Sequence, residues 1–153
     1  MAVEIHEDQP LVEPSTAWPR QLWIPAIAHG HVGAQYQNPA QIQFGQIASG
    51  TVQIPTDFTA LSRLDMVMYP SANAAYTMST TLYFGSVGEA YNIHTQNLAP
   101  AIPMVINVLT HYDLLTLFAA LLALLVPGDD FQVRINNQTG NNVYVYGLDM
   151  RYT

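Results

Sequence analysis

The chain has 153 residues, of which half are apolar and only 10% are charged; it contains four arginines, no lysine and no cysteine, and its formal net charge is −7. So few cations argue against a protein that binds nucleic acid through its phosphates, and the missing cysteines exclude disulfides and thiolate metal sites. An ordinary soluble domain carries about 25% charged residues, and charge discourages association. The composition therefore predicts a surface that neighbouring subunits cover.

Residues 1–20 predict an extended N-terminal arm. The segment contains Pro10, Pro14 and Pro19 and four acidic residues, and it lacks the apolar run of a secretory signal. Proline fixes its own φ and favours extended backbone in the residue before it. We expect the arm to contact another subunit or a capsid shell, and a disordered tail is the alternative. The expected contact residues are Glu4, Glu7, Leu11, Val12 and Trp18.

Residues 21–153 are expected to form one domain, because this length suits a single core. Most of it consists of short segments that alternate apolar and polar residues or are rich in β-branched and aromatic residues, with turn residues between them. In 41–47, for example, Ile42 and Phe44 alternate with glutamines. The pattern predicts strands within 22–32, 41–47, 51–55, 64–70, 75–87, 89–95 and 103–109.

The periodicity changes at Asp113, where strong helix formers begin. One short helix is expected near 113–126, with Asp113 capping its first turn and Pro127-Gly128 ending it. The run is too short to cross a membrane. Thr116 is its only polar interior residue, so the helix is apolar on all sides and should be buried on all sides.

Two sets of side chains on this helix could face the sandwich. The first set is Leu114, Leu117, Leu121 and Leu124; the second set is Leu115, Phe118, Leu122 and Leu125. Whichever set stays outside would form an apolar patch that monomers avoid, so at least one set is expected at a subunit interface. The candidate interface residues are Leu114, Leu115, Leu117, Phe118, Leu121, Leu122 and Leu125.

Residues 131–137 and 143–153 alternate clearly, and the intervening QTGNN has the turn chemistry of a hairpin. Together with the earlier segments, this makes eight or nine short strands with one interposed helix. The expected fold is all-β, a jelly-roll β-sandwich with an extended N-terminal arm.

Several residues invite a metal-site interpretation. His29 and His31 would face the same side of a strand and could begin a metal site, with Glu89 and His94 as remote ligands; a polar loop or interface is the alternative. Gly128-Asp129-Asp130 could bind calcium, but an oxygen cage needs more carboxylates at close spacing, so a turn is the simpler interpretation.

Two other groups of residues invite a catalytic or ligand-binding interpretation. His111 and Asp113 lack a third catalytic group and an oxyanion hole in the sequence. Tyr144, Tyr146 and Tyr152 could stack on sugars or pack in the core or an interface. We therefore expect no catalytic residue, no metal site and no cofactor, and hence no enzyme.

Segments distributed over most of 21–153 resemble small jelly-roll structural proteins of tailed bacteriophages and related viruses. These segments are LWIPA, IPTDFTAL, GEAYNIHT, PGDDFQVRINN and YVYGLDMRYT. The family decorates or cements capsids, often as trimers. The resemblance implies a virion protein, assembled in the host cytoplasm as a homotrimer, that contacts itself and other virion or capsid proteins but neither nucleic acid nor membrane. A receptor- or carbohydrate-binding module of a virion tail or fibre and a cupin-like metalloenzyme are the alternative functions.

Overall fold

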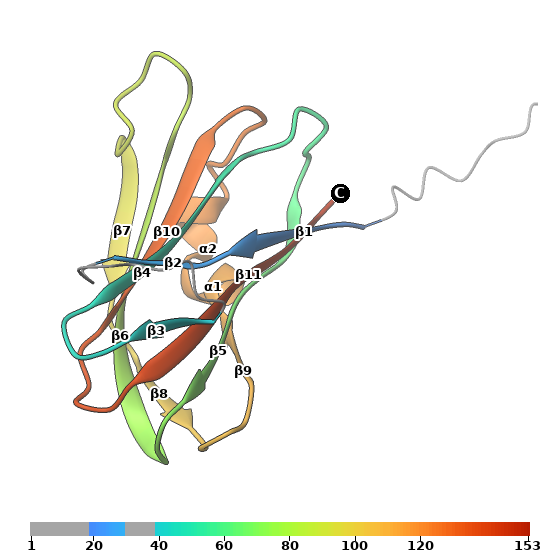
Figure 1. Ribbon diagram of the computed structural model, residues 1–153. Coiled ribbons are helices and arrows are strands. Elements are labelled where there is room, and N and C mark those ends of the chain that lie inside the picture. Colours follow the sequence, from blue (N-terminus) through green and yellow to red (C-terminus); the bar gives the residue numbers. More distant parts are fainter. Residues whose placement is uncertain (1–18, 30–38) are drawn as a thin grey trace, which may run out of the picture.

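Eleven strands form two antiparallel sheets that face each other (Figure 1) in the computed structural model, which describes residues 19–29 and 39–153. The first sheet has the order β1 (Arg20–Pro25), β11 (Val143–Tyr152), β5 (Leu61–Pro70) and β9 (Thr110–Asp113), and β3 (Ala40–Ile42) also pairs with β11. The second sheet has the order β2 (Ile27–His29), β4 (Ile47–Gln53), β10 (Asp130–Asn137), β6 (Ala74–Gly85) and β7 (His94–Leu98), and β8 (Ala101–Met104) also pairs with β6.

The order of the strands is that of a jelly roll. When the eight principal strands β1, β4, β5, β6, β7, β9, β10 and β11 are numbered along the chain, the first sheet has the order 1-8-3-6 and the second 2-7-4-5. The chain crosses between the sheets at every step except from β6 to β7. This double Greek-key arrangement confirms the predicted all-β jelly-roll sandwich.

The expected hairpin over residues 131–153 is wrong. β10 pairs with β4 and β6, whereas β11 pairs with β1, β3 and β5, so the QTGNN segment joins the two sheets. Asn137 holds this crossing, since its Nδ2 donates to the carbonyl oxygen of Asn141 at 2.7 Å and its Oδ1 accepts from the Thr139 N–H at 2.9 Å. Alternation shows that a strand has one buried face, but both sheets have such a face, so alternation does not identify the pairing partner.

A bulge at Gly147 reverses which side of β11 faces the core. Val143 and Val145 point inward before it, and Leu148 and Met150 point inward after it. A Cβ at position 147 would meet the backbone of β1, namely the carbonyl oxygen of Ile24 and, at 3.1 Å, the Cα of Pro25. Glycine therefore allows β1 to lie against β11 at this point.

The single helix expected near 113–126 is two four-residue helices, α1 (Leu114–Leu117) and α2 (Ala119–Leu122), separated at Phe118, whose φ and ψ are −112° and 24°. α1 packs against β5 in the first sheet and α2 contacts β7 in the second, so the pair closes one side of the sandwich. No helix in the described parts of the chain is long and apolar enough to cross a membrane.

The side chains that these helices bury belong to both expected sets. Leu114, Phe118, Leu122 and Leu125 are buried in the core, whereas Leu124 is 53% exposed. The prediction that one complete set would face the sandwich is therefore wrong, and so is the prediction that the helix is buried on all sides. The reason is the break at Phe118, because the spacing of a continuous helix does not apply across it.

Asp113 caps α1 as expected. Its Oδ1 accepts from the Thr116 N–H at 2.9 Å, and its Oδ2 accepts from the Thr116 hydroxyl at 2.6 Å. These hydrogen bonds, the hydroxyl bond first, hold the pKa of Asp113 below its ordinary value, because they favour the charged carboxylate.

Asp113→Ala is expected to lower the free energy of unfolding by about 1 kcal/mol at neutral pH. Because the folded chain lowers the pKa of Asp113, the cap contributes fully above the ordinary aspartate pKa and is lost as pH falls through the lowered pKa. Urea unfolding of both proteins should therefore show a difference that shrinks in acid. Asp130→Ala, at an exposed position at the start of β10, controls for the lost charge. A difference that is independent of pH would contradict the capping role.

Candidate functional site

The candidate interface residues separate into buried and partly exposed groups. Leu114 and Phe118 are fully buried in the core of the single chain, which corrects the expectation that they face a partner. Leu122 and Leu125 also belong to this core, but each keeps a small exposed fraction, 6% and 7%. Leu115, Leu117 and Leu121 pack only partly against that core and stay interface candidates. The expected arm contacts Glu4, Glu7, Leu11, Val12 and Trp18 lie outside the described residues.

The connection from β8 to β9 exposes four aliphatic side chains within five residues. Val105, Ile106, Val108 and Leu109 have exposed fractions of 56%, 42%, 51% and 55%, and we call these four residues the β8–β9 patch. The sequence predicted a strand over 103–109, but β8 ends at Met104. The signal against a strand is Asn107, which interrupts the apolar run.

A tight turn holds the β8–β9 patch outward. Asn107 has a left-handed φ of 60°, a conformation that asparagine tolerates better than most residues. The Val108 N–H donates to the Val105 carbonyl oxygen at 3.0 Å, and the Ile106 N–H donates to the Asn73 side-chain oxygen, in the turn between β5 and β6, at 2.7 Å. The loop is therefore tied to its neighbour, and its apolar side chains are presented to solvent by a formed structure.

Apolar side chains are also exposed on the loop from β6 to β7, which lies at the other end of the sandwich (Figure 1). Val87, Tyr91 and Ile93 are 85%, 74% and 53% exposed. Scattered exposed apolar residues are normal on a monomer, but contiguous ones mark contact surfaces. Four such residues in one short turn make the β8–β9 patch the first candidate for a contact surface among the described residues.

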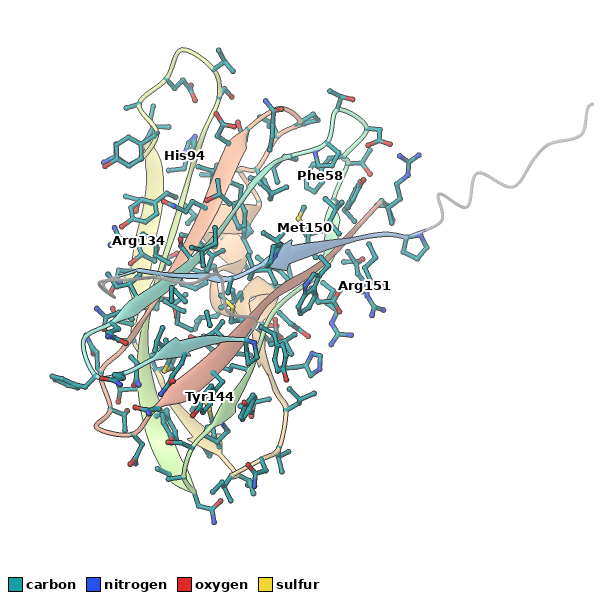
Figure 2. All side chains as sticks on the ribbon, viewed as in Figure 1. Phe58, His94, Arg134, Tyr144, Met150 and Arg151 are labelled. Atoms are coloured by element: carbon teal, nitrogen blue, oxygen red, sulfur yellow. The ribbon has the colours of Figure 1, made fainter. Side chains whose placement is uncertain are left out.

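The outer face of the first sheet gathers charged side chains from β11, β5 and β9, and β1 adds the uncharged side chains of Gln21 and Trp23. Trp23, Asp149, Asp65 and Asp113 stand in one row across β1, β11, β5 and β9. Like charges opposite one another on neighbouring strands destabilise a sheet, so the aspartates of this row need nearby cations to offset their repulsion. Arg63 pairs with Asp65, and Arg151 pairs with Asp149. The side chain of Arg151 points away from the sandwich in Figure 2.

The carboxylates of this row are already paired. The Asp65 Oδ2 atom lies 2.7 Å from Arg63 Nε and 3.3 Å from His111 Nδ1, and the hydrogen bond to Asp65 raises the pKa of Arg63. The Asp149 Oδ1 atom accepts from Gln21 Nε2 at 2.8 Å, and its Oδ2 lies 3.3 Å from Arg151 Nη2. Asp65 and Asp149 are only 7% and 5% exposed. The contacts of Gln21 and Arg63 with Asp149, and of His111 with Asp65, tie the strands of the sheet together. Sequence periodicity could not reveal these cross-strand contacts, because their members are far apart in the chain, unlike the pairs within one strand.

The expected metal and catalytic candidates are dispersed. His29 ends β2, and His31 lies outside the described residues, so the histidine pair is not observed. His94 begins β7 with its ring stacked 4.9 Å from that of Phe84, while Glu89 lies in the exposed β6–β7 loop. Within residues 19–29 and 39–153, no three histidine or carboxylate groups are placed to hold a metal ion.

The remaining candidates have structural contacts. Asp129 is 2% exposed, accepts from the Ser86 hydroxyl at 2.7 Å and from the Val126 N–H at 3.0 Å, and so stabilises a turn. Tyr152 is in the core, and the ring of Tyr144 stacks 4.7 Å from that of Tyr69.

No protein-family model matches the chain, and no curated protein is significantly similar to it.

Proposed function

We propose that the chain is a structural subunit that associates with itself, as a trimer, and with other proteins of a virus particle, in the manner of a capsid decoration or cement protein. The observation that carries the proposal is the β8–β9 patch, because a formed turn presents four exposed aliphatic side chains. An apolar surface of this kind marks a site of contact with another protein.

The energetic scale of such a contact is sufficient for association. Complete burial of a valine, leucine or isoleucine side chain stabilises by about 1.5–3 kcal/mol. The side chains of the patch are about half exposed, so a partner that covers all four would contribute about 3–6 kcal/mol per subunit. The costs of association reduce this sum, and contacts elsewhere on the subunit add to it.

The fold and the composition support a place in a particle. The jelly-roll order of the strands is common in capsid proteins, but the same fold also serves lectins and cupins, so the fold alone does not establish the function. The low charge of the chain favours a covered surface over a solvated one. The sequence resemblance to decoration proteins agrees with both observations, and the virion is the location that we propose.

Val108→Asp is expected to dissociate the subunit, because it places a charge in the centre of the β8–β9 patch. Sedimentation at micromolar concentration should give the mass of three chains for the natural protein and of one chain for the variant, while thermal unfolding stays nearly unchanged. Gln138→Asp is the matched control, since it adds the same charge at an exposed polar position between β10 and β11. A natural protein with the mass of one chain, or a variant that stays associated, would overturn the proposal.

A further inference from the structure

A groove of about 470 Å³ lies between the helix pair and the segment that joins β4 to β5, and its lining residues are eight apolar residues and two threonines. Its floor shows slight exposure of core side chains, Phe58 (6%), Leu122 (6%) and Leu125 (7%). Its exposed lining residues are all small: Thr59, Ala60, Thr116, Ala119 and Ala123. Small exposed residues allow an extended backbone to approach closely and to place an apolar side chain against Phe58, Leu122 and Leu125.

The N-terminal arm begins at the same end of the sandwich as this groove. Arg20, the first residue of β1, is opposite Tyr152 in the sheet, and its guanidinium pairs with the carboxylate of Asp57. The carbonyl oxygen of Thr153 accepts from the N–H groups of Thr59 and Ala60, which line the groove. β1 and β5 are separated only by β11, so the start of β1 lies about 10 Å from the strand that begins at the groove.

The residues before Pro19 have the length and composition to fill such a groove. Residues 1–18 could span up to roughly 60 Å if extended, and their apolar residues include Leu11, Val12 and Trp18. Extended backbone, which the prolines favour, leaves its side chains free for contacts with a partner. The groove carries no charged lining residue, so Leu11, Val12 and Trp18 are the side chains of this segment that suit it, and Glu13 would stay in solvent.

We propose that residues 11–18 of one copy dock in the groove beside α1 and α2 of a neighbouring copy, so that the arms link the subunits. This inference rests on the self-association proposed above and adds where the arm binds. The choice of a neighbouring copy follows from that self-association. The start of β1 and the chain's own groove lie at the same end of the sandwich, so docking within one chain is the alternative that the experiment below must distinguish.

Cysteine cross-linking tests this docking, because the chain has no cysteine and two introduced thiols would be the only ones. The double variant Ser15→Cys with Ala119→Cys places one thiol in the arm and one at the rim of the groove. Ser15→Cys leaves Leu11, Val12 and Trp18 unchanged. After treatment with a short bis-maleimide, we expect covalently linked dimers and trimers on a denaturing gel. The matched control is Ser15→Cys with Ala120→Cys, because Ala120 is exposed on α2 but does not line the groove; its linked product should be at least tenfold less.

The outcomes separate this inference from the proposed function. A natural protein with the mass of one chain overturns both. A natural trimer whose double variant gives only internally linked single chains shows docking in the chain's own groove and overturns the exchange of arms. A natural trimer that gives no linked product, or links equally through position 120, overturns the groove as the docking site and leaves the proposed function standing.

Discussion

Phe118→Ala is expected to lower the free energy of unfolding by about 3–5 kcal/mol. The side chain of Phe118 is fully buried, and the residue separates α1 from α2 at the point where both helices meet the core. Removing the ring leaves a cavity that the two sheets cannot close, because both are held by their strand pairing. Domains of ordinary stability unfold at a cost of about 5–15 kcal/mol, so a large part of the stability would be lost.

The measurement is denaturant unfolding followed by circular dichroism, together with the solution mass of the folded protein. Leu124→Ala is the matched control, since Leu124 belongs to the same apolar run but is 53% exposed, and it should change the free energy of unfolding by less than about 0.5 kcal/mol. A Phe118→Ala protein that unfolds normally but loses its association would place Phe118 at an interface and contradict the core assignment.

Gly147→Ala is expected to detach β1 from the sandwich. The new Cβ would meet the backbone of Ile24 and Pro25, and a backbone that is paired along six residues cannot move aside locally. Inserting an atom into packed structure costs about 1–3 kcal/mol and sometimes more. Here the free energy of unfolding is expected to fall by at least about 3 kcal/mol, because the movement of β1 also uncovers the buried side chain of Ile24.

Hydrogen exchange distinguishes detachment of β1 from general destabilisation. The amides of β1 should lose protection first, while those of β10, which lies in the other sheet, keep it. Gly140→Ala is the control, because a Cβ at that position meets nothing within 4 Å. Normal protection of β1 in this variant would contradict the close approach at Gly147.

Five strands of the sandwich, β1, β5, β6, β10 and β11, and the cap at Asp113 were predictable, because their signals are local. The predicted strands over 41–47, 89–95 and 103–109 are largely turns: β3 ends at Ile42, β7 begins at His94 and β8 ends at Met104. Alternation depends only on one face being buried; it was observed along β10, and on β11 it is interrupted by the bulge at Gly147. Alternation contains no information about which strand lies alongside, so the apparent hairpin is a crossing between sheets. The β8–β9 patch was missed for a related reason, since an apolar run such as VINVL suits a strand and an exposed turn equally until its hydrogen bonds are known.

By itself, the sequence determined the all-β class, the positions of β1, β5, β6, β10 and β11, the N-cap of the first helix and the unusually low charge of the chain. Only the tertiary structure decided which strands share a sheet, which leucines of 114–126 face the core, and which distant residues contact Asp65 and Asp149. The physical reason is the range of each interaction. Periodicity and capping depend on residues within a few positions. A helical segment that is apolar on all sides acquires its orientation only when the two sheets meet, and the polar network of the first sheet acquires its partners only when distant strands pair.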